Sequence, residues 1–164
     1  MTKKQSLLAL LANLVAVGVV SGLSALLSRE GMQRYQTVQK PPLSPPGIVF
    51  PIVWSILFLL MAVSAWLVLR KLTETFSIKG ALCSSALLIY GAQLLVNFFW
   101  PIFFFRFGWN LFSLLWLLLL LYLVVRMIRA FRRIDPLAGN LQIPYVLWLC
   151  FAAYLNAGVW FLSR

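Results

Sequence analysis

The chain has 164 residues, of which 63% are hydrophobic and 10% are charged, with a formal net charge of +11 at pH 7. Soluble domains average about 45–50% apolar and about 25% charged residues, so this composition excludes an ordinary soluble protein. A disordered chain is also excluded, because disorder goes with few aromatic residues, whereas 15% of this chain is aromatic.

Five stretches contain no Asp, Glu, Lys or Arg, and each is long enough to cross a bilayer as a helix of about 20 residues. They are residues 5–28, 41–69, 80–105, 107–125 and 136–163. A chain in lipid must satisfy its backbone hydrogen bonds internally, so the stretches predict an all-α integral membrane protein, a five-transmembrane-helix bundle. We expect a single membrane domain over residues 1–164, with helices at about 6–27, 47–69, 79–104, 108–130 and 141–162.

The first stretch follows two lysines, as the apolar core of a signal peptide would. It is longer than such a core, which has about 7–15 residues, so we expect it to be retained as the first helix. Within it, Gly18 and Gly22 form a GxxxG pattern that allows close helix packing. Residues 28–46 are expected to form a lid loop, because the four prolines within 41–46 remove backbone donors and favour an extended path.

The basic residues divide unevenly between the two ends of the predicted bundle. Nine share one end: Lys3, Lys4, Arg70, Lys71, Lys79, Arg126, Arg129, Arg132 and Arg133. Five share the other end: Arg29, Arg34, Lys40, Arg106 and Arg164. Because basic residues favour the cytoplasmic side, the N-terminus is expected in the cytoplasm, with the lid and the C-terminus outside.

The side chains within the helices exclude most catalytic chemistry. The chain has no His, and its acidic residues, Glu30, Glu74 and Asp135, lie between the apolar stretches. Ser-His-Asp triads and paired carboxylates are therefore excluded, and no metal site is expected. No long basic run supports a nucleic-acid partner, because the basic residues flank spans that contact the lipid bilayer. Function must depend on aromatic, amide and hydroxyl groups.

One face of the third predicted helix combines aromatic and amide side chains. Tyr90, Gln93, Asn97 and Trp100 are spaced i, i+3, i+7 and i+10, so they follow one another along this face. An amide is costly in hydrocarbon unless it is paired, so the face is expected to point into the bundle. Two interpretations stay open: hydrogen bonds between helices alone, or the wall of a ligand pocket.

The second and fifth predicted helices carry comparable faces. Trp54 and Phe58 lie one turn apart, as do Trp148 and Ala152, which share a face with Tyr145. With a rise of about 1.5 Å per residue, the two tryptophans lie about 10–20 Å from the end that bears the lid. The pattern predicts a mostly apolar pocket beneath the lid, in which flat aromatic ligands would stack. A packed core without a ligand is the alternative.

Three segments resemble the motifs of one membrane protein family. They are residues 40–58 (KPPLSPPGIVFPIVWSILF), 93–100 (QLLVNFFW) and 144–156 (PYVLWLCFAAYLN). They look like segments of the translocator protein family, whose members are also called tryptophan-rich sensory proteins or peripheral benzodiazepine receptors. The three segments occur in the right order, and with the five expected helices the resemblance covers essentially the whole chain.

The resemblance implies a compact five-helix bundle, often a homodimer, with a pocket under the first loop. Family members bind porphyrins and haem-type tetrapyrroles, synthetic isoquinoline carboxamides and benzodiazepines, and in animals cholesterol. Porphyrin or haem is thus expected as a ligand, and no cofactor is required. Carried over by motif, the ligand-binding residues are Tyr35, Pro45, Trp54, Phe58, Asn97, Trp100, Trp148 and Ala152.

Two positions depart from the family pattern. Arg34 precedes Tyr35 where many members have a tryptophan. The fifth helix ends at Arg164 without the animal cholesterol motif, which puts cholesterol as a ligand in doubt. The short termini and the two N-terminal lysines indicate a bacterial member in the plasma membrane.

We therefore expect a membrane receptor or binding protein for porphyrins and related tetrapyrroles, with a sensory, regulatory or trafficking role. Some bacterial family members promote light-dependent breakdown of protoporphyrin, so a porphyrin-degrading enzyme with Trp54 and Trp148 as catalytic residues is an alternative. A transporter of small lipophiles and a scaffold without a ligand are further alternatives. Coupled transport usually requires an ionisable residue within the membrane, and the predicted helices have none away from their ends.

Overall fold

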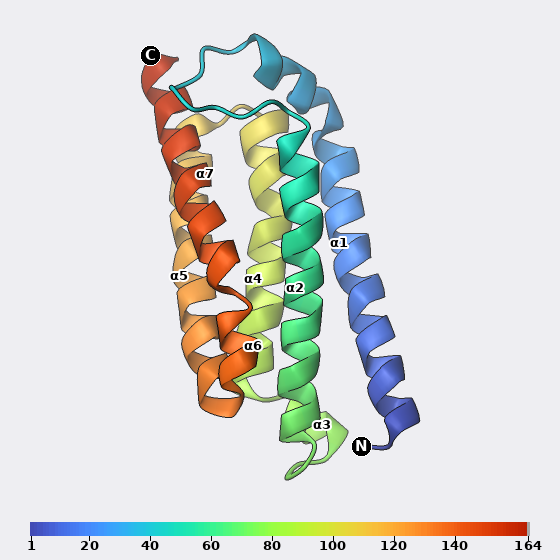
Figure 1. The fold of residues 1–164 in the computed structure, drawn as a ribbon. Coiled ribbons are helices and arrows are strands. Elements are labelled where there is room, and N and C mark those ends of the chain that lie inside the picture. Colours follow the sequence, from blue (N-terminus) through green and yellow to red (C-terminus); the bar gives the residue numbers. More distant parts are fainter. Residues whose placement is uncertain (164) are drawn as a thin grey trace.

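The computed structural model describes residues 1–163, which form helices and no strand (Figure 1). The elements are α1 (Lys3–Thr37), α2 (Val49–Leu72), α3 (Ile78–Leu82), α4 (Ser85–Pro101), the π-helix η1 (Ile102–Arg106), α5 (Asn110–Ile134), α6 (Pro136–Asn140) and α7 (Ile143–Leu162). Five spans are long and apolar enough to cross a membrane: Lys3–Thr37, Val49–Leu72, Ser85–Arg106, Asn110–Ile134 and Pro136–Leu162. The prediction of an all-α protein with five membrane-spanning segments is confirmed.

The first helix is longer than predicted, and the lid is correspondingly shorter. α1 continues to Thr37 instead of ending near residue 27, so residues 28–37 of the expected loop are helical. This extension is rich in Arg, Glu and Gln, which form helices readily in water as well as near a membrane. The helix ends ahead of Pro41, with Val38 already in extended backbone. The lid therefore comprises residues 38–48.

The helix predicted over residues 79–104 is divided into three pieces. α4 begins only after Ser84, whose hydroxyl oxygen accepts a hydrogen bond from the backbone nitrogen of Leu87 at 3.4 Å. Such a cap starts a new helix and leaves α3 as a separate short turn. At the other end, Pro101 has no backbone N–H, and the chain continues as η1, in which Phe107 N donates to Ile102 O at 3.0 Å.

The last two spans differ from the expected bounds of 108–130 and 141–162 by a few residues. α5 extends to Ile134, after which the carboxylate of Asp135 accepts from Ala138 N at 3.1 Å and begins α6. α7 then begins at Ile143, with Pro144 in its first turn. Proline is tolerated there because the first N–H groups of a helix have no partner within it.

The core lies where α5 packs between α4 and α7. α1 packs against α2 and η1, but most of its apolar surface stays outside the bundle (Figure 1). Long-range hydrogen bonds fasten it at several points: Ser24 Oγ donates to Phe98 O at 2.9 Å, Asn13 Nδ2 donates to Ala62 O at 2.8 Å, and Trp66 Nε1 donates to Ser6 O at 3.0 Å. α1 is thus a peripheral helix held at separate points, with an apolar outer face suited to lipid.

The lid crosses the end of the bundle at which α7 finishes (Figure 1). Tyr154 on α7 donates its hydroxyl hydrogen to the carbonyl oxygen of Pro42 at 2.8 Å. One turn further along α7, a Cβ atom at Gly158 would overlap the ring of Pro41. The lid is therefore fastened to α7, on the opposite side of the bundle from α1.

Candidate ligand-binding site

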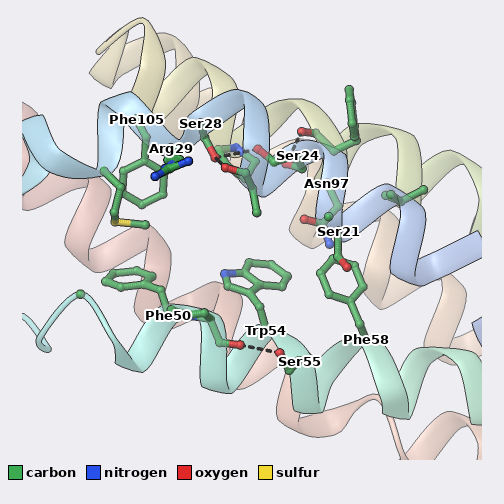
Figure 2. A pocket seen from close by; sticks show the side chains of 18 of the residues that line it. Ser21, Ser24, Ser28, Arg29, Phe50, Trp54, Ser55, Phe58, Asn97 and Phe105 are labelled. Carbon is green, nitrogen blue, oxygen red and sulfur yellow. Dashed lines mark hydrogen bonds between the residues drawn. The ribbon is translucent and has the colours of Figure 1, made fainter. Parts of the chain in front are cut away.

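A cavity of about 690 Å³ lies between α1, α2, α4 and η1 (Figure 2). Small-molecule pockets in proteins occupy about 300–1,000 Å³, so this cavity has the size of a ligand site. Gly47 and Ile48, the last residues of the lid, lie at its edge. The cavity is therefore directly below the point at which the lid joins α2.

The aromatic wall of the cavity comes from α2. Phe50, Trp54 and Phe58 are spaced four residues apart, which places their side chains on one face of the helix. Figure 2 shows all three rings projecting from α2 towards α1. The ring centroids of Trp54 and Phe58 are 5.5 Å apart, so the rings form a continuous surface.

The opposite wall comes from α1, whose small and hydroxyl side chains are followed towards the lid by Arg29, Met32, Gln33 and Gln36. Ser21, Ser24 and Ser28 all line the cavity. Their hydroxyl hydrogens are donated to carbonyl oxygens, from Ser21 to Gly18 at 3.1 Å, from Ser24 to Phe98 at 2.9 Å and from Ser28 to Ser24 at 2.7 Å. Small side chains leave the cavity open, and the internal hydrogen bonds remove the cost of the hydroxyls in an apolar wall.

Asn97 connects the cavity to a buried polar network. Its Nδ2 donates to the hydroxyl oxygen of Tyr145 at 2.8 Å, and that hydroxyl donates to Gln93 Oε1 at 2.9 Å. All three side chains are at most 2% exposed. The network ties α4 to α7, while Asn97 also lines the cavity. The arrangement is compatible with both interpretations of this helix face.

The eight predicted ligand-binding residues divide into two layers. Three of them line the cavity: Trp54, Phe58 and Asn97. Five do not line it: Tyr35, Pro45, Trp100, Trp148 and Ala152. Trp148, which was expected to act with Trp54, is among those outside the cavity.

Trp100 supports Trp54 from behind. The ring centroids of the two residues are 6.3 Å apart, and Tyr145 lies 6.0 Å from Trp54 on the same side. Trp100 is only 1% exposed and stacks on Phe104 with a centroid separation of 5.5 Å. The contacts leave Trp100 no free face towards a ligand but fix the position of Trp54.

Tyr35 and Trp148 lie behind Phe50. Their ring centroids are 5.7 Å and 5.8 Å from that of Phe50. Ala152 is buried in the core next to α5, and Pro45 is half-buried in the lid. Tyr35 and Trp148 therefore support the aromatic wall without forming its surface.

The sequence prediction missed the contribution of α1 and η1 to the cavity. Ala25 and Arg29 of α1 and Phe105 of η1 line it, although no site residue was expected before Tyr35. A signal for α1 was available, because Ser21, Ser24, Ser28 and the Gly18–Gly22 pattern mark a helix surface of small residues. The sequence gives no comparable signal for η1, because its π-helical turn depends on the path of the chain after Pro101.

The chemistry of the wall is suited to binding. Residues 1–163 contain no group of three or more side chains suited to holding a metal ion. Arg29 is the one charged residue among those that line the cavity. An aromatic face opposite small residues, with few polar groups, suits a flat and mostly apolar molecule.

The fold and the site together define a class: a helical integral membrane protein with five spans and an aromatic-lined cavity beneath a lid. The sequence profile of the TspO/MBR family matches residues 9–161, and the chain belongs to this family. The resemblance noted from the three sequence segments is thereby confirmed.

Named relatives occur in both animals and bacteria. The chain is 32% identical to the translocator protein of Ovis aries over 137 residues, which is 80% of this chain and 75% of the relative. It is 34% identical to the tryptophan-rich protein TspO of Chlorobaculum tepidum over 122 residues, 74% of each chain. It is 32% identical to the tryptophan-rich sensory protein of Cereibacter sphaeroides over 143 residues, 87% of this chain and 84% of the relative.

Proposed function

We propose that the protein binds porphyrins and related tetrapyrroles, or similar flat lipophilic molecules such as isoquinoline carboxamides, in a sensory, regulatory or trafficking role. The observation that carries the proposal is the cavity, in which Phe50, Trp54 and Phe58 face the small residues of α1. A flat ring system fits between an aromatic wall and a wall of small side chains. Each aromatic contact contributes about 0.5–1.5 kcal/mol beyond the burial of apolar area.

Titration with protoporphyrin IX tests the proposal. We expect saturable quenching of tryptophan fluorescence in the purified protein, because Trp54 lies in the cavity wall. Ala25→Phe adds a ring inside the cavity and should weaken binding about tenfold or more, since overpacking a filled site costs about 1–3 kcal/mol. Leu26→Phe adds a similar ring at a neighbouring position that is 63% exposed and does not line the cavity.

Equal affinity of the Ala25→Phe and Leu26→Phe variants would place binding outside the cavity. Absence of saturable quenching in the unaltered protein would contradict the proposed function and leave a scaffold as the better interpretation. Movement of the ligand between vesicles, measured with the same porphyrin, distinguishes a carrier of small lipophiles from a receptor that only binds.

Light-dependent degradation of porphyrin is the second candidate, and the surroundings of Trp54 favour it. Its indole contacts the cavity on one side and lies 6.3 Å from Trp100 and 6.0 Å from Tyr145 on the other. Indole and phenol are the most readily oxidised side chains in this part of the bundle. Loss of the porphyrin absorption band only under illumination, and only with oxygen present, would identify this activity.

We infer that the protein lies in a bacterial plasma membrane with its N-terminus in the cytoplasm. The unequal division of basic residues between the two ends of the bundle supports this orientation. We also propose a homodimer, which the family resemblance implies. α1 offers a surface for it, since a Cβ atom at Gly18 would meet nothing within 4 Å and would leave room for a second helix.

A further inference from the structure

The exposed face of α5 changes from leucine to arginine along the helix. Its members recur at intervals of three or four residues, which places them on one stripe. From the middle of the helix to its end they are Leu115, Leu118, Tyr122, Arg126, Arg129 and Arg133. The buried residues of α5, among them Leu120, Val124 and Phe131, lie on the opposite side. The stripe therefore points away from the core and towards the surrounding lipid.

The arginines of this stripe begin before α5 leaves the membrane. The helix starts at Asn110, and its 25 residues span about 37 Å. The hydrocarbon core of a bilayer is about 30 Å thick. Arg126 lies about 24 Å from the start of the helix, so its backbone is still within that thickness. A cation that faces lipid at this depth is costly unless its head group reaches the interface and meets an anion there.

The arginines of the stripe have no anionic partner in the protein. Arg126 Nη1 donates to the hydroxyl oxygen of Tyr122 at 2.8 Å, a contact that leaves the positive charge in place. Arg129 and Arg133 make no hydrogen bond, ion pair or cation–π contact with any of residues 1–163. The carboxylate that follows in the sequence, Asp135, accepts from a backbone nitrogen at 3.1 Å to begin α6. Three positive charges on one face therefore stay uncompensated.

The other two arginines at this end of the bundle are engaged. Arg70 lies over the ring of Trp66 at 5.0 Å from its centroid. Arg132 adjoins Arg133 in the sequence but lies off the stripe, and its Nε donates to Asn140 Oδ1 at 3.0 Å. The stripe is thus distinguished from the general positive charge of this end by its position and by its free donors.

The two halves of the stripe match the two halves of a phospholipid. Leu115 and Leu118 are 58% and 46% exposed and offer a surface to acyl chains. Arg126 and Arg129 lie about one helical turn apart, so one phosphate can accept hydrogen bonds from both. A free anion in water would use only the arginine half. A second copy of the chain suits the face less well, because a two-fold contact here would bring like charges together.

We propose that the stripe is a binding site for an anionic phospholipid. Arg126, Arg129 and Arg133 bind the headgroup phosphate, and the leucine half contacts the acyl chains. The lipid belongs to the leaflet at the end of α6, where the N-terminus lies (Figure 1). None of these residues lines the cavity, so the site is independent of the proposed function. Arginine suits this role because its planar fork donates two parallel hydrogen bonds to a phosphate.

Native mass spectrometry of the purified protein in detergent micelles tests the site. Phosphatidylglycerol and phosphatidylcholine with identical acyl chains are added separately, so that only the headgroup differs. We expect a one-to-one complex with phosphatidylglycerol at about a tenfold lower concentration, equivalent to about 1.4 kcal/mol. Arg129→Gln/Arg133→Gln should abolish this preference, since each basic residue beside an anionic headgroup contributes about fivefold in affinity.

Arg70→Gln/Arg132→Gln is the matched control. It removes two positive charges from the same end of the bundle, but both positions lie off the stripe. We expect this variant to keep the preference for phosphatidylglycerol. All four arginines are exposed, so neither variant disturbs the core, and circular dichroism verifies the helix content. Arg129→Lys/Arg133→Lys keeps the charge but not the fork and should retain part of the preference.

The same spectra contain the results that would overturn the proposal. Equal binding of the two lipids by the unaltered protein would show that headgroup charge is not recognised. Equal loss in the two double-glutamine variants would reduce the effect to net charge. Displacement of the lipid by inorganic phosphate, compared with chloride at the same ionic strength, would identify a site for free phosphate. A changed dimer fraction in Arg129→Gln/Arg133→Gln would assign the face to a contact between copies of the chain.

Discussion

At the scale of single residues, the two tryptophans predicted to share one role occupy different surroundings. Trp54 lies in the cavity wall, whereas Trp148 packs behind Phe50 with a centroid separation of 5.8 Å. Trp148 Nε1 is buried and has no partner among the described residues. The structure therefore separates direct ligand contact from support of the wall.

This difference predicts the behaviour of two matched variants. Trp54→Phe keeps most of the apolar area, so it should bind protoporphyrin IX within about tenfold of the unaltered protein, equivalent to about 1.4 kcal/mol. Any light-dependent loss of porphyrin should collapse in Trp54→Phe, because the oxidisable indole is gone, and persist in Trp148→Phe. Absorbance decay under illumination measures the loss. Unchanged decay in Trp54→Phe would leave Trp54 as pocket lining only.

Asn97 allows a second prediction at this scale, because its amide is both a structural bridge and part of the cavity wall. Asn97→Leu removes the donor to Tyr145 and places an apolar group beside a buried hydroxyl. Leaving a buried polar group with fewer partners costs about 1–3 kcal/mol, so the variant should unfold at a lower temperature. We expect porphyrin affinity to change less than stability, as measured by thermal unfolding and fluorescence titration. A larger loss of affinity than of stability would instead indicate direct ligand recognition by this amide.

At the scale of elements, α1 contacts the bundle in both halves and comes very close to η1 at Gly31. Gly31 is buried against η1, and a Cβ atom there would overlap the carbonyl group of Phe105. Only glycine fits at this position, because there is no space for a side chain between α1 and η1. Towards the N-terminus, Asn13 and Ser6 keep α1 hydrogen-bonded to α2 and α4, while large apolar side chains of α1 face outward.

Gly31→Ala should therefore push α1 away from η1 and lower the melting temperature. Because the obstacle is backbone and cannot rotate aside, we expect a loss of about 1–3 kcal/mol, as for an overpacked core. Gly91→Ala in α4 is the control, since a Cβ there meets nothing within 4 Å. Replacing glycine within a helix stabilises it by about 0.5–1 kcal/mol, so Gly91→Ala should unfold at the same or a higher temperature. Equal melting temperatures of the two variants would show that the contact of α1 with η1 is not tight.

At the scale of the whole molecule, the bundle has two chemically different ends. The N-terminus lies at the same end as α3 and α6, and the lid lies at the opposite end with the C-terminal end of α7 (Figure 1). The larger group of basic residues belongs to the end of α3 and α6. The positive-inside rule assigns that end to the cytoplasm.

Cysteine labelling measures this orientation. Cys83 and Cys150 are both exposed, so they are first replaced by alanine. In that background, Ser163→Cys should react with a membrane-impermeant maleimide in intact cells, and Thr2→Cys should react only after permeabilisation. Labelling of Thr2→Cys alone in intact cells would reverse the topology.

The sequence alone determined what depends on composition and on spacing within one helix. Charge-free length specified five membrane spans, because the bilayer demands about 20 apolar residues for each helix. The four-residue spacing of Trp54 and Phe58 placed both on one face of α2, because neighbours on a helix recur every three to four residues. The buried face of α4, with Gln93 and Asn97, was also predictable because lipid penalises unpaired amides.

Only the tertiary structure decided which helix faces which. The sequence placed aromatic faces on α2, α4 and α7 and suggested one shared pocket, but the faces of α4 and α7 pair through Asn97 and Tyr145. The open space lies instead between α2 and α1, where small side chains and the Gly31 contact with η1 set the separation. The periodicity of the sequence shows in which direction a side chain points from the axis of its own helix. How each helix is rotated about its axis relative to its neighbours depends on long-range packing. For the same reason, the sequence shows Arg29 only as the residue that follows an apolar stretch. That Arg29 lines the cavity is seen only in the folded molecule.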